Sequence, residues 1–256
     1  MLVRLYNLVN FFFHHAKKTP LKSEISCYRT QHPNQLKNQL QQIALRPGQA
    51  VFFWNKRIRR VDHIAIVPSQ DKKQLNLLEA KLVHAIPPSN KNESDYSGVS
   101  TWTAVDFIGN LNKTYSRIIV GSLAEASAHQ LQKAGAIAKE VSITKKIDNK
   151  VALYSLPLIS NFCYVKWFDF DTHLKFKIGI PYLVAKKETG RMTGWMATYC
   201  GDLVGRIFQQ AGITDLPKIN FLGQSYFRSS AFYDHMKENG TIDNIIMWND
   251  KTPNKY

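Results

Sequence analysis

The stretch from Ala50 to Val67 reads AVFFWNKRIRRVDHIAIV, two apolar runs joined by a basic segment. Residues 50–54 and 61–67 each have the length of a strand and are rich in β-branched and aromatic side chains. Pro47-Gly48 before the first run is a turn signal, and the connection from Asn55 to Arg60 is short enough for a hairpin. We therefore expect an antiparallel hairpin here, from which the rest of the sheet extends.

The chain on both sides of this hairpin predicts further strands and helices. Apolar runs predict strands at 75–80, 117–121, 151–159 and 164–170. Helical patterns occupy 34–44, 101–108, 122–141 and 200–211. Ser122 and Glu125 form a capping box for the third helix, and Gly212 is placed to end the fourth. Strands cluster before and after helices without strict alternation, so we predict an α+β fold rather than a doubly wound parallel sheet.

The chain divides into three segments. Residues 1–44 are expected to hold an amphipathic helix within Met1 to Lys18, followed by a polar linker. We favour a helix docked on the body of the protein over one lying on a membrane surface. Residues 45–239 form one domain without internal repeats, and residues 240–256 are a polar tail that we expect to pack little.

Composition gives a basic protein with enough apolar residues for a core. Of its 256 residues, 44% are hydrophobic and 21% are charged. Lysine and arginine number 34 against 19 acidic residues, a formal net charge of +15. Such a charge predicts an anionic partner or an anionic membrane surface.

Three cysteines are too few, and odd in number, for a disulfide framework. A reducing compartment or a free functional thiol is therefore favoured, and we expect a location that is either reducing or membrane-peripheral. The amino terminus lacks a convincing secretory signal, and no apolar run approaches the ~20 residues of a transmembrane helix.

Several chemistries lack their motifs. The sequence has no Cys-x-x-Cys pair, no His-Glu-x-x-His, no Gly-Lys-Ser/Thr phosphate loop and no Gly-x-Ser-x-Gly. We therefore expect no metal and no cofactor.

What remains is a cysteine with a histidine. Cys200 opens an amphipathic helix, where free amides and the helix dipole favour a thiolate, although Asp202 in the same turn works against it. His63 is an imidazole within an apolar strand, and Glu79 is a lone carboxylate in the next apolar run, which a hairpin could place beside the ring. A carboxylate, a histidine and a thiol in this relation are typical of nucleophilic catalysis. A buried structural cysteine and a satisfied core histidine are the simpler alternatives.

The order of five segments resembles the circularly permuted NlpC-type papain-like hydrolases of the YiiX-like group. These segments are Arg46 to Phe53, Asp62 to Val67, Leu78 to Ala80, Gly179 to Tyr182 and Tyr199 to Val204. In that family the histidine strand precedes the cysteine helix, the reverse of the papain order. The resemblance covers about 45–211 and implies an antiparallel sheet packed on helices.

The resemblance also implies roles for individual residues. Cys200 would be the nucleophile, His63 the general base and Glu79 the residue that orients the base. Tyr182 matches the tyrosine of the family's Gly-x-Pro-Tyr segment, and its hydroxyl could help to hold an oxyanion. Two departures stand out: Gly201-Asp202 replaces the usual serine and glutamate, and an insert at about 142–177 could cover the cleft or be ordinary core and loop.

Two basic segments would lie near the cleft of the resembled fold. One is the hairpin connection and the other precedes Cys200; their side chains are Arg57, Arg59, Arg60, Lys186 and Lys187. They either hold an anionic group such as a phosphate or carboxylate or form a solvated basic surface.

We therefore predict a thiol-dependent hydrolase or acyltransferase that cleaves an amide or ester through an acyl-thioester on Cys200. Its expected substrate is lipid-like or a peptide amide, including cell-wall peptide. The alternative is a non-catalytic binding module on the same scaffold that engages anionic lipid or nucleic acid. Dispersed basic residues and the lack of a recognition motif argue against nucleic acid as a partner.

Overall fold

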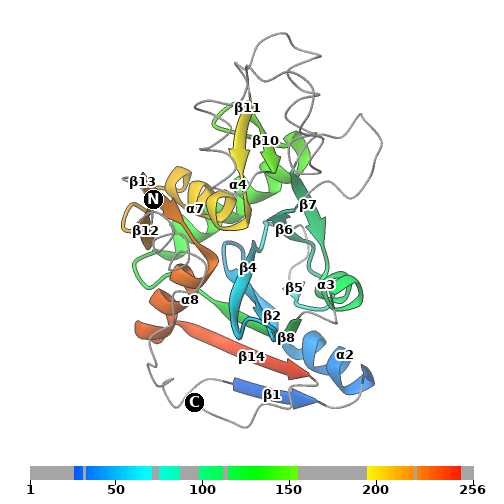
Figure 1. Cartoon of the computed structure of the whole chain (residues 1–256). Helices are drawn as coiled ribbons and strands as arrows, with labels where there is room; N and C mark the ends of the chain where they lie inside the picture. The colour runs from blue at the N-terminus through cyan, green and yellow to red at the C-terminus, as the bar shows by residue number, and fades with distance from the viewer. Residues whose placement is uncertain are drawn as a thin grey trace, which may run out of the picture.

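The computed structural model describes residues 26–30, 33–70, 75–86, 98–111, 115–154, 195–221 and 224–248. Within this part of the chain, a seven-stranded sheet forms the centre of the molecule (Figure 1). Its strands, in spatial order, are β1 (Ser26–Thr30), β14 (Ile242–Trp248), β8 (Tyr115–Gly121), β3 (Ala50–Asn55), β4 (Arg60–Ile66), β6 (Leu82–Ala85) and β7 (Val99–Trp102).

Six of these strands, from β14 to β7, are antiparallel to their neighbours, and β1 is parallel to β14. The expected hairpin is confirmed, because β3 and β4 pair from Ala50↔Ile66 to Asn55↔Arg60. A bulge beside Phe53 shifts the register, and Arg59 takes a positive φ of 53° in the connecting turn. The α+β class predicted from the sequence is therefore confirmed.

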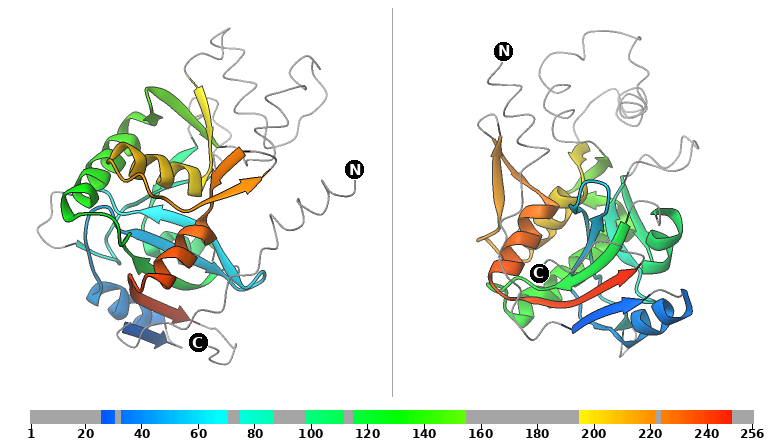
Figure 2. Two further views of the ribbon diagram at one scale, coloured as in Figure 1. Left: turned by 90° about the vertical axis from the view of Figure 1, so that its left-hand side faces the viewer. Right: turned by 60° about the horizontal axis from the view of Figure 1, so that its bottom comes forward.

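Helices cover both faces of the sheet (Figures 1 and 2). The helices α4 (Ala128–Thr144), α7 (Cys200–Gln210) and α8 (Ser229–Glu238) contribute to one face. The helices α2 (Pro33–Gln42) and α3 (Ala104–Leu111) contribute to the other. Each face buries its own apolar cluster, because strand side chains alternate between the two sides of a sheet.

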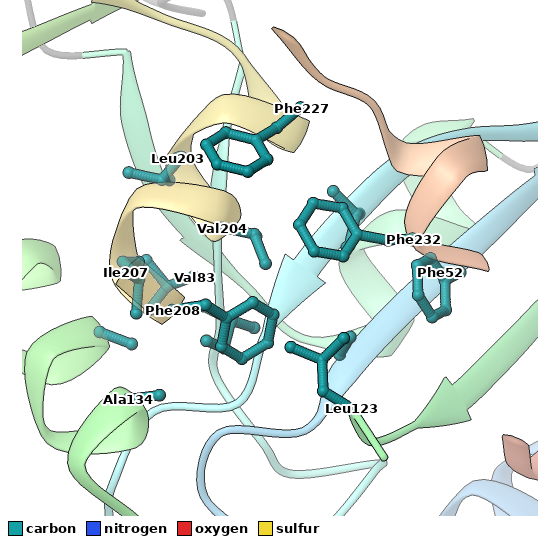
Figure 3. Packing of buried hydrophobic residues seen from close by; sticks show 14 of the residues in the cluster. Phe52, Val83, Leu123, Ala134, Leu203, Val204, Ile207, Phe208, Phe227 and Phe232 are labelled. Atoms are coloured by element: carbon teal, nitrogen blue, oxygen red, sulfur yellow. The ribbon is translucent and has the colours of Figure 1, made fainter. Parts of the chain in front are cut away.

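The first cluster joins the sheet to α4, α7 and α8. Figure 3 shows side chains of α7 packed against the sheet and α8; they include Leu203, Val204, Ile207 and Phe208. The second cluster joins the opposite face to α2 and α3, with Phe53 of β3 stacked on Phe107 of α3 at a ring-centroid distance of 3.9 Å. At roughly 1.5–3 kcal/mol for each large apolar side chain buried, both clusters contribute substantially to stability.

Shorter strands form three small sheets around the main one. Their members are β9 (Lys146–Ile147), β10 (Lys150–Tyr154) and β11 (Trp195–Thr198); β12 (Lys218–Phe221) and β13 (Gln224–Phe227); and β2 (Ala44–Leu45) and β5 (Leu75–Asn76). The first part of the expected insert thus continues α4 and then forms β9 and β10. Residues 155–194, including the strand expected at 164–170, lie outside the described residues.

The expectation that residues after Gly240 pack little is wrong for Ile242–Trp248. This segment is β14, an interior strand of the sheet, and Ile242, Ile245 and Ile246 are buried. Its alternation of polar and apolar residues is weak at the start, where Gln49 donates to the Asp243 carboxylate at 2.7 Å. The strand is therefore anchored partly by polar contacts. The polar residues that make these contacts are the reason why the sequence predicted a tail.

Other boundaries also differ from the sequence prediction. The capping box of α4 is Ser127 with Gln130, not Ser122 with Glu125, so the helix begins later than expected. The helix predicted at 101–108 is present as α3, but it begins at Ala104, because residues 101–102 still belong to β7. The expected amphipathic helix within 1–18 lies outside the described residues. Among the helices that are described, none has the length and apolar character needed to cross a membrane.

Candidate active site

Cys200 is the first residue of α7, as the sequence predicted. Two glycines let the start of this helix approach the segment 227–229 closely. A Cβ on Gly201 would lie 2.9 Å from the carbonyl oxygen of Phe227, and one on Gly205 would lie 2.3 Å from the ring of Phe227. The hydroxyl of Tyr199 donates to the same Phe227 carbonyl. The first turn of α7 is therefore fixed against the beginning of α8.

The thiol of Cys200 lies against the backbone of β4 on both sides of His63. Its sulfur is 3.8 Å from the carbonyl oxygen of Asp62, and the backbone of Ile64 also hydrogen-bonds to the sulfur. The hydroxyl of Ser229, the first residue of α8, lies 3.4 Å from the same sulfur. Three elements, α7, β4 and α8, thus meet at the thiol.

His63 is buried, and its ring projects into the second cluster. The ring centroid lies 5.8 Å from that of Phe53 and 5.5 Å from that of Phe107. Its Nε2 is 3.0 Å from Nδ1 of His84, a fully buried residue on β6. When His63 Nε2 donates in this bond, Nδ1 of His63 is left unprotonated and can act as a base.

The partner of His63 is His84, and the expectation for Glu79 is wrong. The predicted strand at 75–80 is only β5, Leu75–Asn76, which pairs with β2 outside the main sheet. Glu79 lies on the turn that follows and is exposed, with its amide bonded to the side chain of Asn76. The strand beside β4 is β6, so the residue that meets the imidazole comes from the next segment of the chain.

Burial shifts the pKa values of His63, His84 and Cys200. It lowers the pKa of His63 to about 3 and that of His84 well below its ordinary value. It also raises the pKa of the Cys200 thiol, outweighing the hydrogen bonds from Ser229, Ile64 and Gly201, which lower it. At neutral pH the site therefore holds a neutral thiol and a neutral imidazole, rather than the thiolate that the helix dipole alone would favour.

Of the other predicted site residues, some are placed by the structure and some lie outside the described residues. Arg57 and Arg59 are exposed on the β3–β4 turn, whereas Arg60 is half-buried at the start of β4. Tyr182, Lys186 and Lys187 lie outside the described residues. The structure thus unites Cys200 with the strand of His63 and separates both from Glu79.

Sequence reasoning missed two residues of this site. His84 carries the same signal as His63, an imidazole in a short apolar strand, and that signal could have identified it. Ser229 reaches the thiol through the packing of α8, which begins 29 residues after Cys200. No local pattern marks that contact.

Searches of protein-family models, curated proteins and solved structures found no significant match to this chain. The chemistry of the site therefore has to be argued from its own geometry.

Proposed function

We propose that the protein is a cysteine hydrolase or acyltransferase in which Cys200 is the nucleophile and His63 the general base. The observation that carries this proposal is the position of the thiol. It begins a helix, and its sulfur contacts backbone groups on both sides of His63. The order of a histidine strand before a cysteine helix is the one expected of permuted NlpC-type hydrolases.

The pair is neutral at pH 7, so the reaction requires a proton transfer from the thiol to His63, which the lowered pKa of the imidazole and the raised pKa of the thiol both oppose. His63 would take the thiol proton as the sulfur attacks the carbonyl carbon of an amide or ester. The imidazole would return that proton to the departing amine or alcohol, leaving an acyl-thioester on Cys200. Water or an acceptor alcohol would then attack the thioester and release the thiol.

His84 acts in this proposal as a positioning residue. Its bond to Nε2 of His63 fixes the ring plane, and when His63 Nε2 is the donor it leaves Nδ1 of His63 free. In this role a neutral histidine replaces the carboxylate that the sequence suggested. Burial favours such a replacement, because an unpaired carboxylate among Trp102, Phe107 and His63 would be costly.

An acyl-trapping experiment tests the proposal. The full chain is incubated with an activated fatty-acyl ester and an activated peptide ester, and the acylated peptides are identified by mass spectrometry. We expect an acyl group on Cys200 in the wild type and in Cys27→Ala, and none at this position in Cys200→Ala. Equal labelling of Cys27, Cys163 and Cys200 at the rate of the denatured chain would contradict it.

A non-catalytic binding module remains the second candidate. It is favoured by the raised pKa of the thiol and by sulfur contacts that a structural cysteine also makes. The net charge of +15 would then engage an anionic lipid surface. Salt-sensitive binding to anionic vesicles by a protein that forms no acyl-thioester would support this candidate.

A further inference from the structure

Two arginines flank the groups that touch the thiol. Arg60 on β4 lies two residues before Asp62, whose carbonyl oxygen contacts the sulfur. Arg228 lies one residue before Ser229, whose hydroxyl contacts the sulfur from the other side. Since α8 packs against β4, both arginines belong to the same border of the site.

The backbone of Arg228 is held tightly against α7. A Cβ on Gly201, the residue after the nucleophile, would lie 3.1 Å from the Cα of Arg228. Arg228 also occupies the N-cap position of α8 and makes no side-chain cap there. The backbone of Arg228 is therefore fixed beside the first turn of α7, the helix that begins at Cys200.

Arg60 retains an unsatisfied donor. Its Nε is buried and has no hydrogen-bond partner within the described residues, and Oδ1 of Asp62 is in the same condition. The other carboxylate oxygen, Oδ2 of Asp62, accepts from the amide of Asn55 at 2.6 Å. A buried guanidinium nitrogen without an acceptor is costly, and an anionic ligand would satisfy it.

The charge of the Arg60 guanidinium also acts on that of Arg228. Burial, followed by the charge of Arg60, lowers the pKa of Arg228 to about 10. Asp234 opposes this effect on Arg228, and Asp62 does so on Arg60. Burial raises the pKa of Asp234 to about 6, so this counter-charge is weakened near that pH.

We propose that Arg60 and Arg228 form a subsite for an anionic group of the substrate, a carboxylate or a phosphate, beside the Cys200 thiol. This proposal rests on the proposed function and names the class of substrate. The exposed Arg57 and Arg59 of the turn lie outside the subsite. Of the three arginines in the β3–β4 connection, only the half-buried Arg60 belongs to it.

A pair of alkylating reagents tests the subsite without requiring turnover. Iodoacetate carries a carboxylate and iodoacetamide does not, so the ratio of their rate constants at Cys200 reports an attraction for anions. We expect this ratio to be several-fold higher in the native protein than in the denatured chain. Arg60→Gln and Arg228→Gln should each lower it by about three- to tenfold, the size expected for a half-exposed charge-assisted contact.

Lys133→Gln on the exposed side of α4 removes the same charge and should leave the ratio unchanged. A ratio equal to that of the denatured chain would overturn the subsite. So would an equal loss in Lys133→Gln, or a loss found only in Arg57→Gln.

Competition at constant ionic strength separates the two sources of negative charge. Protection of Cys200 from iodoacetate by inorganic phosphate, more than by butyrate, would indicate a phosphate-bearing substrate, and the reverse order a carboxylate. Failure of both anions to protect would overturn the subsite.

A thermal-shift titration with inorganic phosphate distinguishes this failure from that of the proposed function. If Cys200 reacts with neither reagent, the catalytic proposal fails, and the titration alone decides the subsite. Stabilisation by phosphate that is lost in Arg60→Gln and Arg228→Gln but kept in Lys133→Gln supports it. Equal stabilisation of all four proteins overturns it.

Discussion

The two faces of the sheet differ in the polar side chains that they bury. The first cluster, under α4, α7 and α8, is almost wholly aliphatic and aromatic, and Cys200 packs at its border. On the opposite face, the second cluster surrounds two imidazoles, His63 and His84, with aromatic rings. The Cys200 thiol and the His63 imidazole therefore lie in different packing environments.

The alternation of side chains along β4 explains the position of the Cys200 thiol. Side chains of one strand alternate between faces, so Ile64 joins the first cluster while His63 projects into the second. A helix on the first face can reach the histidine only along the border of β4. The contacts of Cys200 with the backbone of Asp62 and Ile64 lie at this border.

The largest effect on stability is expected in the first cluster. Gly205→Ala would put a Cβ 2.3 Å from the ring of Phe227, so α7 must move or the ring must turn. We expect a loss of about 2–4 kcal/mol in the free energy of unfolding, near the upper range for overpacking. Urea denaturation of the full chain measures it.

Gly212→Ala serves as the comparison for that variant. Gly212 follows α7 with a φ of 89°, and a Cβ there would make only an ordinary contact with the side chain of Gln130 at 3.8 Å, so backbone strain is the main term that opposes a side chain. We expect about 1 kcal/mol there. Equal losses in both variants would mean that α7 does not depend on close approach to Phe227.

The buried histidines of the second cluster should make the free energy of unfolding sensitive to acid. An unfolded histidine has a pKa of about 6.5, whereas burial lowers that of folded His63 to about 3. Between these values the unfolded chain binds a proton that the folded chain does not, so stability falls as pH falls. The expected slope is about 1.4 kcal/mol per pH unit for one such group.

Urea denaturation at pH 4, 5, 6 and 7 checks this slope. His63→Gln should show a shallower decline than the wild type, because one of the two buried imidazoles is gone. His129→Gln, on the exposed surface of α4, should follow the wild type. Parallel curves for all three proteins would show that His63 is not a neutral buried group.

The smallest effect is expected where α8 meets the thiol. The Ser229 hydroxyl, 3.4 Å from the sulfur, lowers the pKa of Cys200 and so partly offsets burial. Ser229→Ala should raise that pKa further and slow iodoacetamide labelling of Cys200 at pH 8 by about threefold, the range of one weak hydrogen bond. Ser230→Ala, at the next position of α8, is the matched control. A pH profile of Cys200 labelling that Ser229→Ala does not move would remove the serine from the site.

The sequence predicted the elements whose period is regular and local. The hairpin of β3 and β4 followed from two apolar runs, and α7 from its apolar stripe and from Gly212 at its end. The prediction of Cys200 at the start of α7 depended only on that helix boundary. These features needed no knowledge of which strands are neighbours.

Strand neighbours were the part that local patterns could not determine. The apolar run of Glu79 is the one that follows β4 most closely in the chain, so the sequence predicts it as the neighbour of His63, but the chain passes through β5 before β6 returns to the sheet. The β14 strand fills an interior position from the far end of the sequence. Long-range strand pairing therefore determines both that His84 contacts His63 and that residues 242–248 form a strand of the main sheet.

The rate of acylation in a histidine variant tests the central claim most directly. That claim is that His63, from the second cluster, activates the thiol of Cys200 at the border of the first. Single-turnover acylation of Cys200 by an activated ester would be followed by mass spectrometry in the wild type, His63→Gln, His84→Gln and the surface control His129→Gln. We predict a loss of about 10²-fold or more in His63→Gln, a smaller loss in His84→Gln, and no change in the control. Equal acylation rates in His63→Gln and the wild type, with both proteins folded, would contradict it.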